Sequence, residues 1–354
     1  MSTDENKLNK HFKLMIFILT AGLGILMLVM LTVGRYHICL SDMFSILSDR
    51  LTGNITEGQS GLVQNPSRSY DINAANVLLN IRLPRVILSV MVGAALSLAG
   101  CTYQSIFCNP MASPDVLGAS TGACFGAALA ILLDFNGAGI TISAFVFSLL
   151  TIILVFALSL KSGGSKITSL ILIGIMVSSL FSAATSYIEL IADPAVKLPA
   201  ITYWMMGSLS GASVSEVVQS FVFMIIPGLL LFMLRWRINL LTLPEDEAES
   251  LGVNVKALRY ICIVLSSLLT ASCVAVSGLV GWVGLVIPNV ARMIFGSNTK
   301  RTIPLSILMG GIFLLLVDTL ARTLLAVEIP IGIITSFLGA PFFILLLFKE
   351  GKSK

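Results

Sequence analysis

Charged residues are scarce in this chain. Of its 354 residues, 11% are Asp, Glu, Lys or Arg, whereas 56% are hydrophobic. A soluble globular protein usually carries about 25% charged residues, so most of this surface must face something other than water. The formal net charge is only +4, which argues against a nucleic-acid-binding protein.

Histidine is nearly absent, with His11 and His37 alone in the sequence. The six cysteines fall mostly within apolar runs, where they are expected to behave as small buried hydrophobes. Their spacing matches neither a disulfide framework nor a set of metal ligands. We therefore expect no metal site in this chain.

Long uncharged stretches are abundant instead. A transmembrane helix needs about 20 apolar residues, and the sequence predicts an all-α integral membrane protein with about ten spans. Glycines and Pro288 divide the uncharged run 260–291 into two of them. The predicted spans are 14–34, 86–107, 116–133, 140–160, 167–188, 217–234, 260–276, 279–295, 302–325 and 333–348.

Loop charge predicts the orientation of these spans. With the N-terminus in the cytoplasm, 15 of the 22 Lys and Arg residues lie inside and 7 outside, as the positive-inside rule requires. The whole chain, 1–354, is then one transmembrane domain with both termini inside. It has a cytoplasmic tail at 1–13, an extracytoplasmic segment at 35–82 and a cytoplasmic loop at 240–258.

A weak internal repeat accompanies this pattern. A shift of 178 residues places Gly100 on Gly278 and Pro110 on Pro288. Two halves of five spans each have opposite orientations in the membrane, and such 5+5 inverted repeats are common in transporters.

The segment Gly118-Ala-Ser-Thr-Gly122 fits the G-x-S-x-G pattern of serine hydrolases. A nucleophilic serine needs a general base, and both histidines lie outside the predicted spans. Gly118, Gly122 and Gly126 also fit a G-x-x-x-G series that allows close helix packing. We favour packing over an intramembrane protease.

Acidic residues are rare within the spans, whereas ion-coupled transporters usually carry them there. The clearest is Asp318, four residues before Arg322, a spacing that predicts a structural ion pair on one helix face. Near the C-terminus, Gly351-Lys352-Ser353 resembles the end of a phosphate-binding loop, but Leu346 occupies the position of its first glycine. Any ATP must then be bound by another subunit.

The loop 240–258 has helix signals, with Thr242 as a cap, Pro244 in the first turn and Gly252 at the end. A second short helix is expected to begin near Asn254. Two short helices would form a docking surface for a partner, although an ordinary ordered loop fits these residues equally well. On the outer side, Arg82, Arg85 and Arg322 would contact either lipid headgroups or an acidic partner.

The sequence resembles the FecCD-type permeases, the membrane subunits of ABC importers for iron-siderophores, vitamin B12 and haem. The resemblance extends from residue 82 to residue 348. Its motifs include Arg82-Leu-Pro-Arg85, Asn109-Pro-Met-Ala-Ser-Pro-Asp-Val-Leu-Gly118, Gly281-Trp-Val-Gly-Leu-Val-Ile-Pro288 and Gly339-Ala-Pro-Phe-Phe343. The histidine that usually follows Ile-Pro in this family is replaced here by Asn289.

The resemblance implies a vitamin B12 importer-like (type II ABC importer) fold in the inner membrane of a prokaryote. It implies a homodimer that catalyses nothing itself, two partner ATPase subunits that bind ATP and Mg, and an extracytoplasmic substrate-binding protein. An iron-siderophore is the first choice of substrate, with cobalamin, haem or molybdate as alternatives. An ion-coupled secondary transporter is the alternative of another class.

The resemblance also assigns roles to individual residues. Arg82, Arg85 and Arg322 would dock the binding protein, and the translocation pathway and its gate would include Asn109, Pro110, Ser165 and Thr168. The helices that dock the ATPase would include Pro244, Glu245, Ala248, Leu251, Gly252, Val253 and Leu258.

Overall fold

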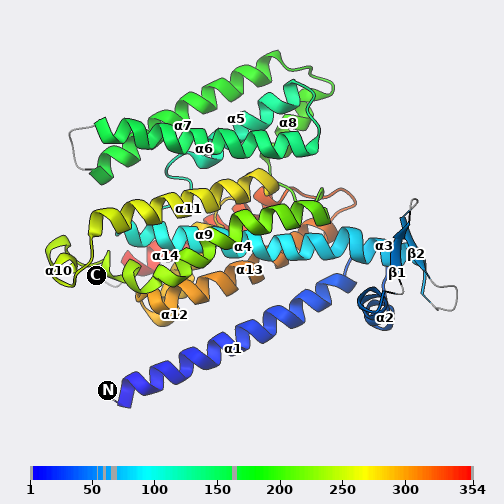
Figure 1. Ribbon diagram of the computed structural model, residues 1–354, viewed down its shortest axis with the longest axis horizontal. Helices are drawn as coiled ribbons and strands as arrows, with labels where there is room; N and C mark the ends of the chain where they lie inside the picture. The colour runs from blue at the N-terminus through cyan, green and yellow to red at the C-terminus, as the bar shows by residue number, and fades with distance from the viewer. Residues whose placement is uncertain (1–2, 54, 59–60, 65–69, 162–165, 352–354) are drawn as a thin grey trace.

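The computed structural model describes residues 3–53, 55–58, 61–64, 70–161 and 166–351, and these are almost entirely helical (Figure 1). The elements in chain order are α1 (Thr3–Thr32), α2 (Leu40–Leu51), β1 (Ile55–Gly58), β2 (Gly61–Gln64), α3 (Ile72–Asn76), the π-helix η1 (Val77–Arg82), α4 (Leu83–Ile106), α5 (Ala119–Leu132), α6 (Gly137–Lys161), α7 (Lys166–Ile191), α8 (Lys197–Met205), α9 (Val214–Leu240), α10 (Glu245–Ser250), α11 (Val255–Ser277), α12 (Val283–Phe295), α13 (Thr299–Thr323) and α14 (Ile331–Gly351).

Each of the ten predicted spans coincides with a helix. Seven helices of the described chain are long and apolar enough to cross a membrane, and α5, α12 and α14 are shorter apolar helices. The 14 residues of α5 rise only about 21 Å, less than the roughly 30 Å of a hydrocarbon core. The protein is therefore a multi-pass membrane protein, and the exact number of crossings stays a prediction.

The segment 35–82, predicted to be extracytoplasmic, contains secondary structure of its own. It contains α2, an antiparallel hairpin of β1 and β2, and α3. The helical run that contains α3, η1 and α4 is continuous over Ile72–Ile106. Sequence reasoning began this span at residue 86 because the charges of Arg82 and Arg85 indicated a loop, but both lie within the helical run.

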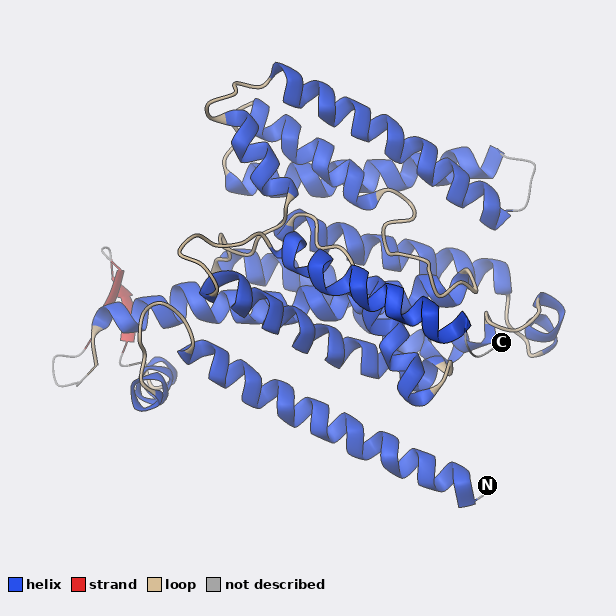
Figure 2. Ribbon diagram, turned by 180° about the vertical axis from the view of Figure 1, so that it is seen from behind, coloured by secondary structure: helices blue, strands red, loops and turns tan. Residues whose placement is uncertain are grey.

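The core is built around α4, which packs against α13, α11, α12 and α9. Glycines allow the closest approaches, since a Cβ on Gly93 would collide with the carbonyl oxygen of Gly310 in α13. A separate layer of α5 to α8 contacts this core through α11, and α1 lies on the opposite side against α13 (Figures 1 and 2).

Both termini and α10 lie at one end of the molecule, whereas α2 and the hairpin lie at the other (Figure 1). This arrangement agrees with termini that share one side of the membrane. Which side that is remains the prediction made from loop charge.

Helix lengths suggest a repeat, but not with the predicted offset. α4, α5 and α6 have 24, 14 and 25 residues, and α11, α12 and α13 have 23, 13 and 25. The shift of 178 residues is wrong in register, because it pairs Gly100 inside α4 with Gly278, which follows the end of α11. Small residues match each other at many offsets, so the sequence could not fix this one.

Candidate functional site

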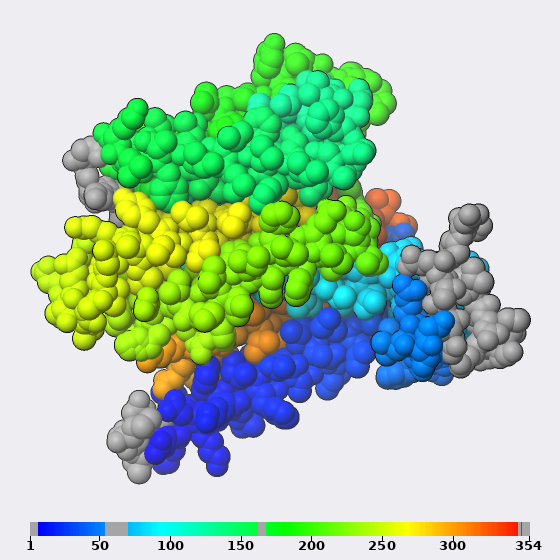
Figure 3. Space-filling view, viewed as in Figure 1, coloured from blue at the N-terminus to red at the C-terminus, as the bar shows by residue number. Residues whose placement is uncertain are grey.

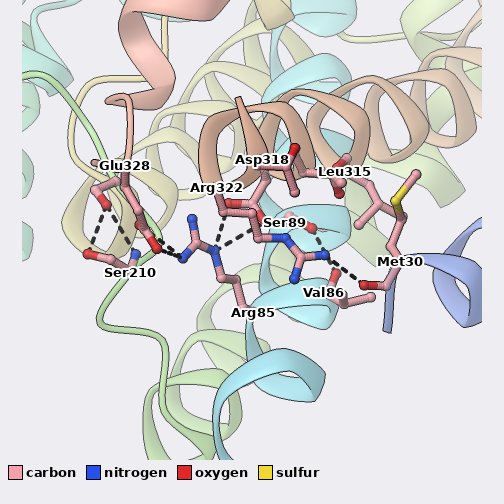
Figure 4. Close-up of polar contacts among 12 residues, drawn as sticks. Met30, Arg85, Val86, Ser89, Ser210, Leu315, Asp318, Arg322 and Glu328 are labelled. Atoms are coloured by element: carbon pink, nitrogen blue, oxygen red, sulfur yellow. Dashed lines mark hydrogen bonds and ion pairs between the residues drawn. The ribbon is translucent and has the colours of Figure 1, made fainter. Parts of the chain in front are cut away.

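Three arginines and two acids lie at the end of the bundle where α1 ends, and Figure 4 shows two of the arginines, Arg85 and Arg322, with both acids. The Nε atom of Arg85 donates to Asp318 Oδ1 at 2.9 Å, and its Nη1 atom donates to Glu328 Oε1 at 2.9 Å. The Asp318 side chain is fully buried, whereas that of Glu328 is 31% exposed. Arg85 therefore joins α4 to α13 and to the segment before α14.

Asp318 and Arg322, predicted to form an ion pair, each have a different direct partner in the structure. Asp318 pairs with Arg85 of α4, and the Arg322 guanidinium instead donates to the carbonyl oxygen of Met30 at 2.7 Å. The spacing of four residues does place both groups on one face of α13. The sequence could not show that α4 brings a nearer cation to that face.

Arg82 forms hydrogen bonds with the C-terminal end of α1. Its Nη1 atom donates to the carbonyl oxygens of Leu31 at 2.8 Å and Thr32 at 3.0 Å, and its Nη2 atom donates to that of Tyr36. The last carbonyls of a helix lack partners within it, and cations near that end are favourable. Arg82 and Arg322 thus both satisfy carbonyl groups at the end of α1.

Beside this contact lies an exposed polar pair outside the membrane-spanning segments. The Tyr36 hydroxyl donates to Asp71 Oδ2 at 2.7 Å, and the backbone N–H of Asn73 donates to Oδ1 at 3.0 Å. These hydrogen bonds, that of Tyr36 first, hold the pKa of Asp71 below its ordinary value. Asp71 thereby caps α3.

The docking of a binding protein by these three arginines stays a prediction, and within this subunit their charges are largely covered. Arg82, Arg85 and Arg322 are only 4%, 5% and 8% exposed. Each guanidinium is directed into the subunit, where buried carbonyls and carboxylates bind it. The inward direction of the three guanidinium groups was not predicted, because the polar residues of segment 35–82 indicated a solvent-exposed surface.

At the opposite end of the molecule, α10 forms an exposed helical turn between α9 and α11. It begins after Pro244 and ends before Gly252, whose φ of +78° favours glycine. Thr242 does not cap it, because its hydroxyl donates to the carbonyl of Asn239. The predicted second short helix is also wrong, since Asn254 caps α11, a helix of 23 residues.

The residues predicted to dock an ATPase therefore occupy one turn and the start of a long helix. Ala248 and Leu258 are buried and anchor this turn, whereas Leu251 is 60% exposed. Pro244, Glu245 and Gly252 are exposed and Val253 is half-buried. A cavity of about 380 Å³ lies beside the turn, between it and the ends of α9 and α11.

A larger cavity, of about 710 Å³, opens between the end of α8, the segment that joins α11 to α12, and α14. Its walls are apolar, with Met206, Leu279, Ile333 and Phe337 on them and Ser336 as a polar group. Glycines that interrupt the apolar runs were the one indication of this cavity in the sequence. Its side formed by α8 was missed, because α8 was not predicted.

The residues predicted for the pathway do not line this cavity. Asn109 and Pro110 lie in the loop after α4, and Thr168 is exposed in the first turn of α7. Ser165 lies outside the described residues, as do Lys352 and Ser353. The Nδ2 atom of Asn289 donates to the Pro110 carbonyl at 2.9 Å, so the residue found in place of the usual histidine joins α12 to this loop.

The glycines of the G-x-S-x-G segment lie in close helix contacts. A Cβ on Gly122 would collide with Thr151 of α6, and one on Gly126 would lie 2.5 Å from the carbonyl oxygen of Ser143. Gly118 has a φ of +75° and faces Ser178 of α7. Ser120 is buried, an environment that suits helix packing and not an exposed nucleophile.

Comparison with known families identifies the protein class. The FecCD transport family matches residues 22–349. The chain belongs to this family. FecCD chains are the permease subunits of ABC importers and are not themselves enzymes. Membership of this family implies ATPase and binding-protein partners, and a location in the inner membrane of a prokaryote.

FecCD relatives with several cargoes resemble this chain. It is 38% identical to the molybdate import system permease protein MolB of Haemophilus influenzae over 94% of this chain and 95% of that one. A probable iron chelatin transport system permease protein of Helicobacter pylori is 44% identical over 77% and 82% of the two chains. The hemin transport system permease protein HmuU of Yersinia pestis is 38% identical over 79% and 85%.

A solved structure supports the FecCD fold. A metal-chelate type ABC transporter in an inward-facing conformation superposes with a TM-score of 0.81 and 38% identity, covering 95% of this chain and 99% of that one. This match extends the family assignment to the arrangement of the helices.

Proposed function

We propose that this FecCD chain forms a homodimer that moves a metal chelate, with an iron-siderophore as first choice, into the cytoplasm. The observation that carries the choice of substrate is the apolar lining of the 710 Å³ cavity beside α14. A bulky chelate suits many weak apolar contacts, whereas a small oxyanion such as molybdate requires hydrogen-bond donors or cations around it.

The energy for transport comes from partner ATPases in this proposal. ATP must bind one arrangement of the assembly better than the other to shift the populations of outward-open and inward-open states. The α10 turn is the proposed point of contact, since it projects from the end that carries both termini (Figure 1). Because α10 lies between α9 and α11 in the chain, movement of the bound ATPase would be transmitted through these two helices to the core.

Replacement of Leu251 by Ser is expected to weaken ATPase binding about tenfold, as loss of an apolar hot spot does. Leu251 is 60% exposed at the end of α10, so the permease should keep its own stability. The measurement is the amount of the cognate ATPase that copurifies with the permease. Leu51→Ser is the matched control, because Leu51 is 89% exposed at the opposite end; equal ATPase retention by both variants would reject the α10 assignment.

Substrate choice is tested by uptake into liposomes that contain the permease, its ATPase and its binding protein. We expect accumulation of a radiolabelled ferric chelate, with no inhibition by a hundredfold excess of molybdate. Accumulation of molybdate, and none of the chelate, would leave the FecCD assignment intact and overturn the choice of substrate. Cobalamin and haem serve as further competitors in the same assay.

A further inference from the structure

An apolar groove of about 390 Å³ runs between α9 and α4, away from the cavity beside α14. Phe221, Ile225, Gly228 and Phe232 lie along its α9 wall. They are spaced three or four residues apart and cover roughly 16 Å at 1.5 Å per residue. Atoms of α13 reach the surface between α9 and α1 (Figure 3), and Ile307 of α13 lines the groove.

Small residues leave the groove open. Ala94 and Ala95 lie on its α4 wall, and Gly228 lies on the α9 wall. A Cβ on Gly228 would have only Leu98 Cδ2 near it, at 3.8 Å. The groove therefore has room beside Gly228 for a chain of methylene groups, and this room is lined by apolar side chains.

Two cations lie close to the Phe232 end of the groove. The guanidinium carbon of Arg235 is 4.0 Å from the ring centroid of Phe232, which lines the groove. The Lys300 Nζ atom is 4.5 Å from the ring centroid of Trp236. Across the described part of the chain, neither cation forms an ion pair with a carboxylate.

A hydrogen bond between helices keeps the cations together. The Thr299 hydroxyl donates to the carbonyl of Arg235 at 2.8 Å, so the start of α13 is fixed beside the end of α9. Lys300 is the second residue of α13. Arg235 lies about one helical turn after Phe232 on α9. The two basic residues are thus held on adjoining helix ends, next to the Phe232 end of the groove.

The depth of this position matches a lipid headgroup. α9 has 27 residues, which rise about 40 Å, whereas a hydrocarbon core is about 30 Å thick. The last few residues of α9 therefore lie at the membrane boundary. Trp236, which is 47% exposed, is a residue type enriched at that level.

We propose that the groove binds an anionic phospholipid, with one acyl chain along α9 and the phosphate at Arg235 and Lys300. Basic residues beside apolar grooves between membrane helices are suited to acidic headgroups. A second copy of the chain packed on this face would bury both cations against an identical cationic surface, which is unfavourable.

Native mass spectrometry of the detergent-purified full chain tests the site with two added lipids, phosphatidylglycerol and phosphatidylcholine. We expect a single retained phosphatidylglycerol, bound in preference to phosphatidylcholine. Arg235→Gln and Lys300→Gln should each reduce this preference about fivefold, the effect of one basic residue at a membrane surface. Gly228→Leu should reduce retention of both lipids, because it fills the groove.

Matched variants make the test specific. Lys13→Gln removes an exposed cation from α1, and Gly24→Leu adds a side chain where no atom lies within 4 Å; both should bind lipid as the parent does. An unchanged preference in both charge variants would overturn the proposal, and they are surface changes that should not impair folding. Crosslinking of G228C subunits to one another would overturn it too, since the groove would then be a subunit interface.

Discussion

Replacement of Arg85 by Met is expected to lower the folding stability by about 3–5 kcal/mol, the usual cost of removing one partner of a buried ion pair. Arg85 donates to Asp318 and to Glu328. Asp318 is fully buried, so loss of the guanidinium leaves a carboxylate without its cation in an apolar core. The measurement is thermal unfolding of the detergent-purified protein.

A double-mutant cycle distinguishes the two possible partners of Asp318. Asp318→Asn should cost less than Arg85→Met, because Arg85 keeps Glu328. The coupling energy between positions 85 and 318 should exceed about 1 kcal/mol, as expected for contacting charges. Arg322→Gln should couple more weakly to Asp318→Asn, since Arg322 donates to the Met30 carbonyl. A larger coupling for Arg322 than for Arg85 would contradict this assignment.

Replacement of Gly100 by Ala is expected to be the second most damaging change. A Cβ at this position would collide with the carbonyl group of Gly284, where α4 crosses α12. Overpacking of a well-packed core costs about 1–3 kcal/mol, and here backbone atoms, not a flexible side chain, must move. A lower melting temperature and a smaller monodisperse fraction in size-exclusion chromatography would record the loss.

Gly228→Ala is the matched control for this change. Both glycines lie in long apolar helices, so the effect of the substitution on helix propensity is the same. The nearest atom to a Cβ at Gly228 is 3.8 Å away, and its melting temperature should stay the same or rise slightly. Equal losses for the two variants would mean that α4 and α12 do not approach as closely as described.

The positions of the helices could be predicted from the sequence because lipid exposure requires long uncharged runs. All ten predicted spans coincide with helices, but α8 was missed. Lys197 begins α8, which has only nine residues, so neither length nor charge marked it as a membrane element. The start of the α4 run was also missed, because charged residues are usually a sign of a loop, whereas here Arg82 and Arg85 form hydrogen bonds inside the bundle.

The candidate site was harder to predict, because it depends on contacts between distant segments. Arg85 and Asp318 are separated by 233 residues, and a spacing argument can only pair groups on one helix. The apolar cavity beside α14 likewise combines two helices and the segment between α11 and α12. The end of α10 was easier to predict, because the positive φ of Gly252 is a local backbone preference of glycine. Its start was predicted less well, since Pro244 is the N-cap and not part of the first turn.

In the proposed mechanism, ATP hydrolysed by a partner subunit drives transport through this FecCD chain. Liposomes containing the permease and its cognate ATPase, with the substrate-loaded binding protein added on the outside, test this most directly. We predict uptake that requires both internal ATP and the binding protein and that is unchanged when proton and sodium gradients are collapsed. Uptake that proceeds without ATP and follows an imposed ion gradient would contradict the account and favour an ion-coupled secondary transporter.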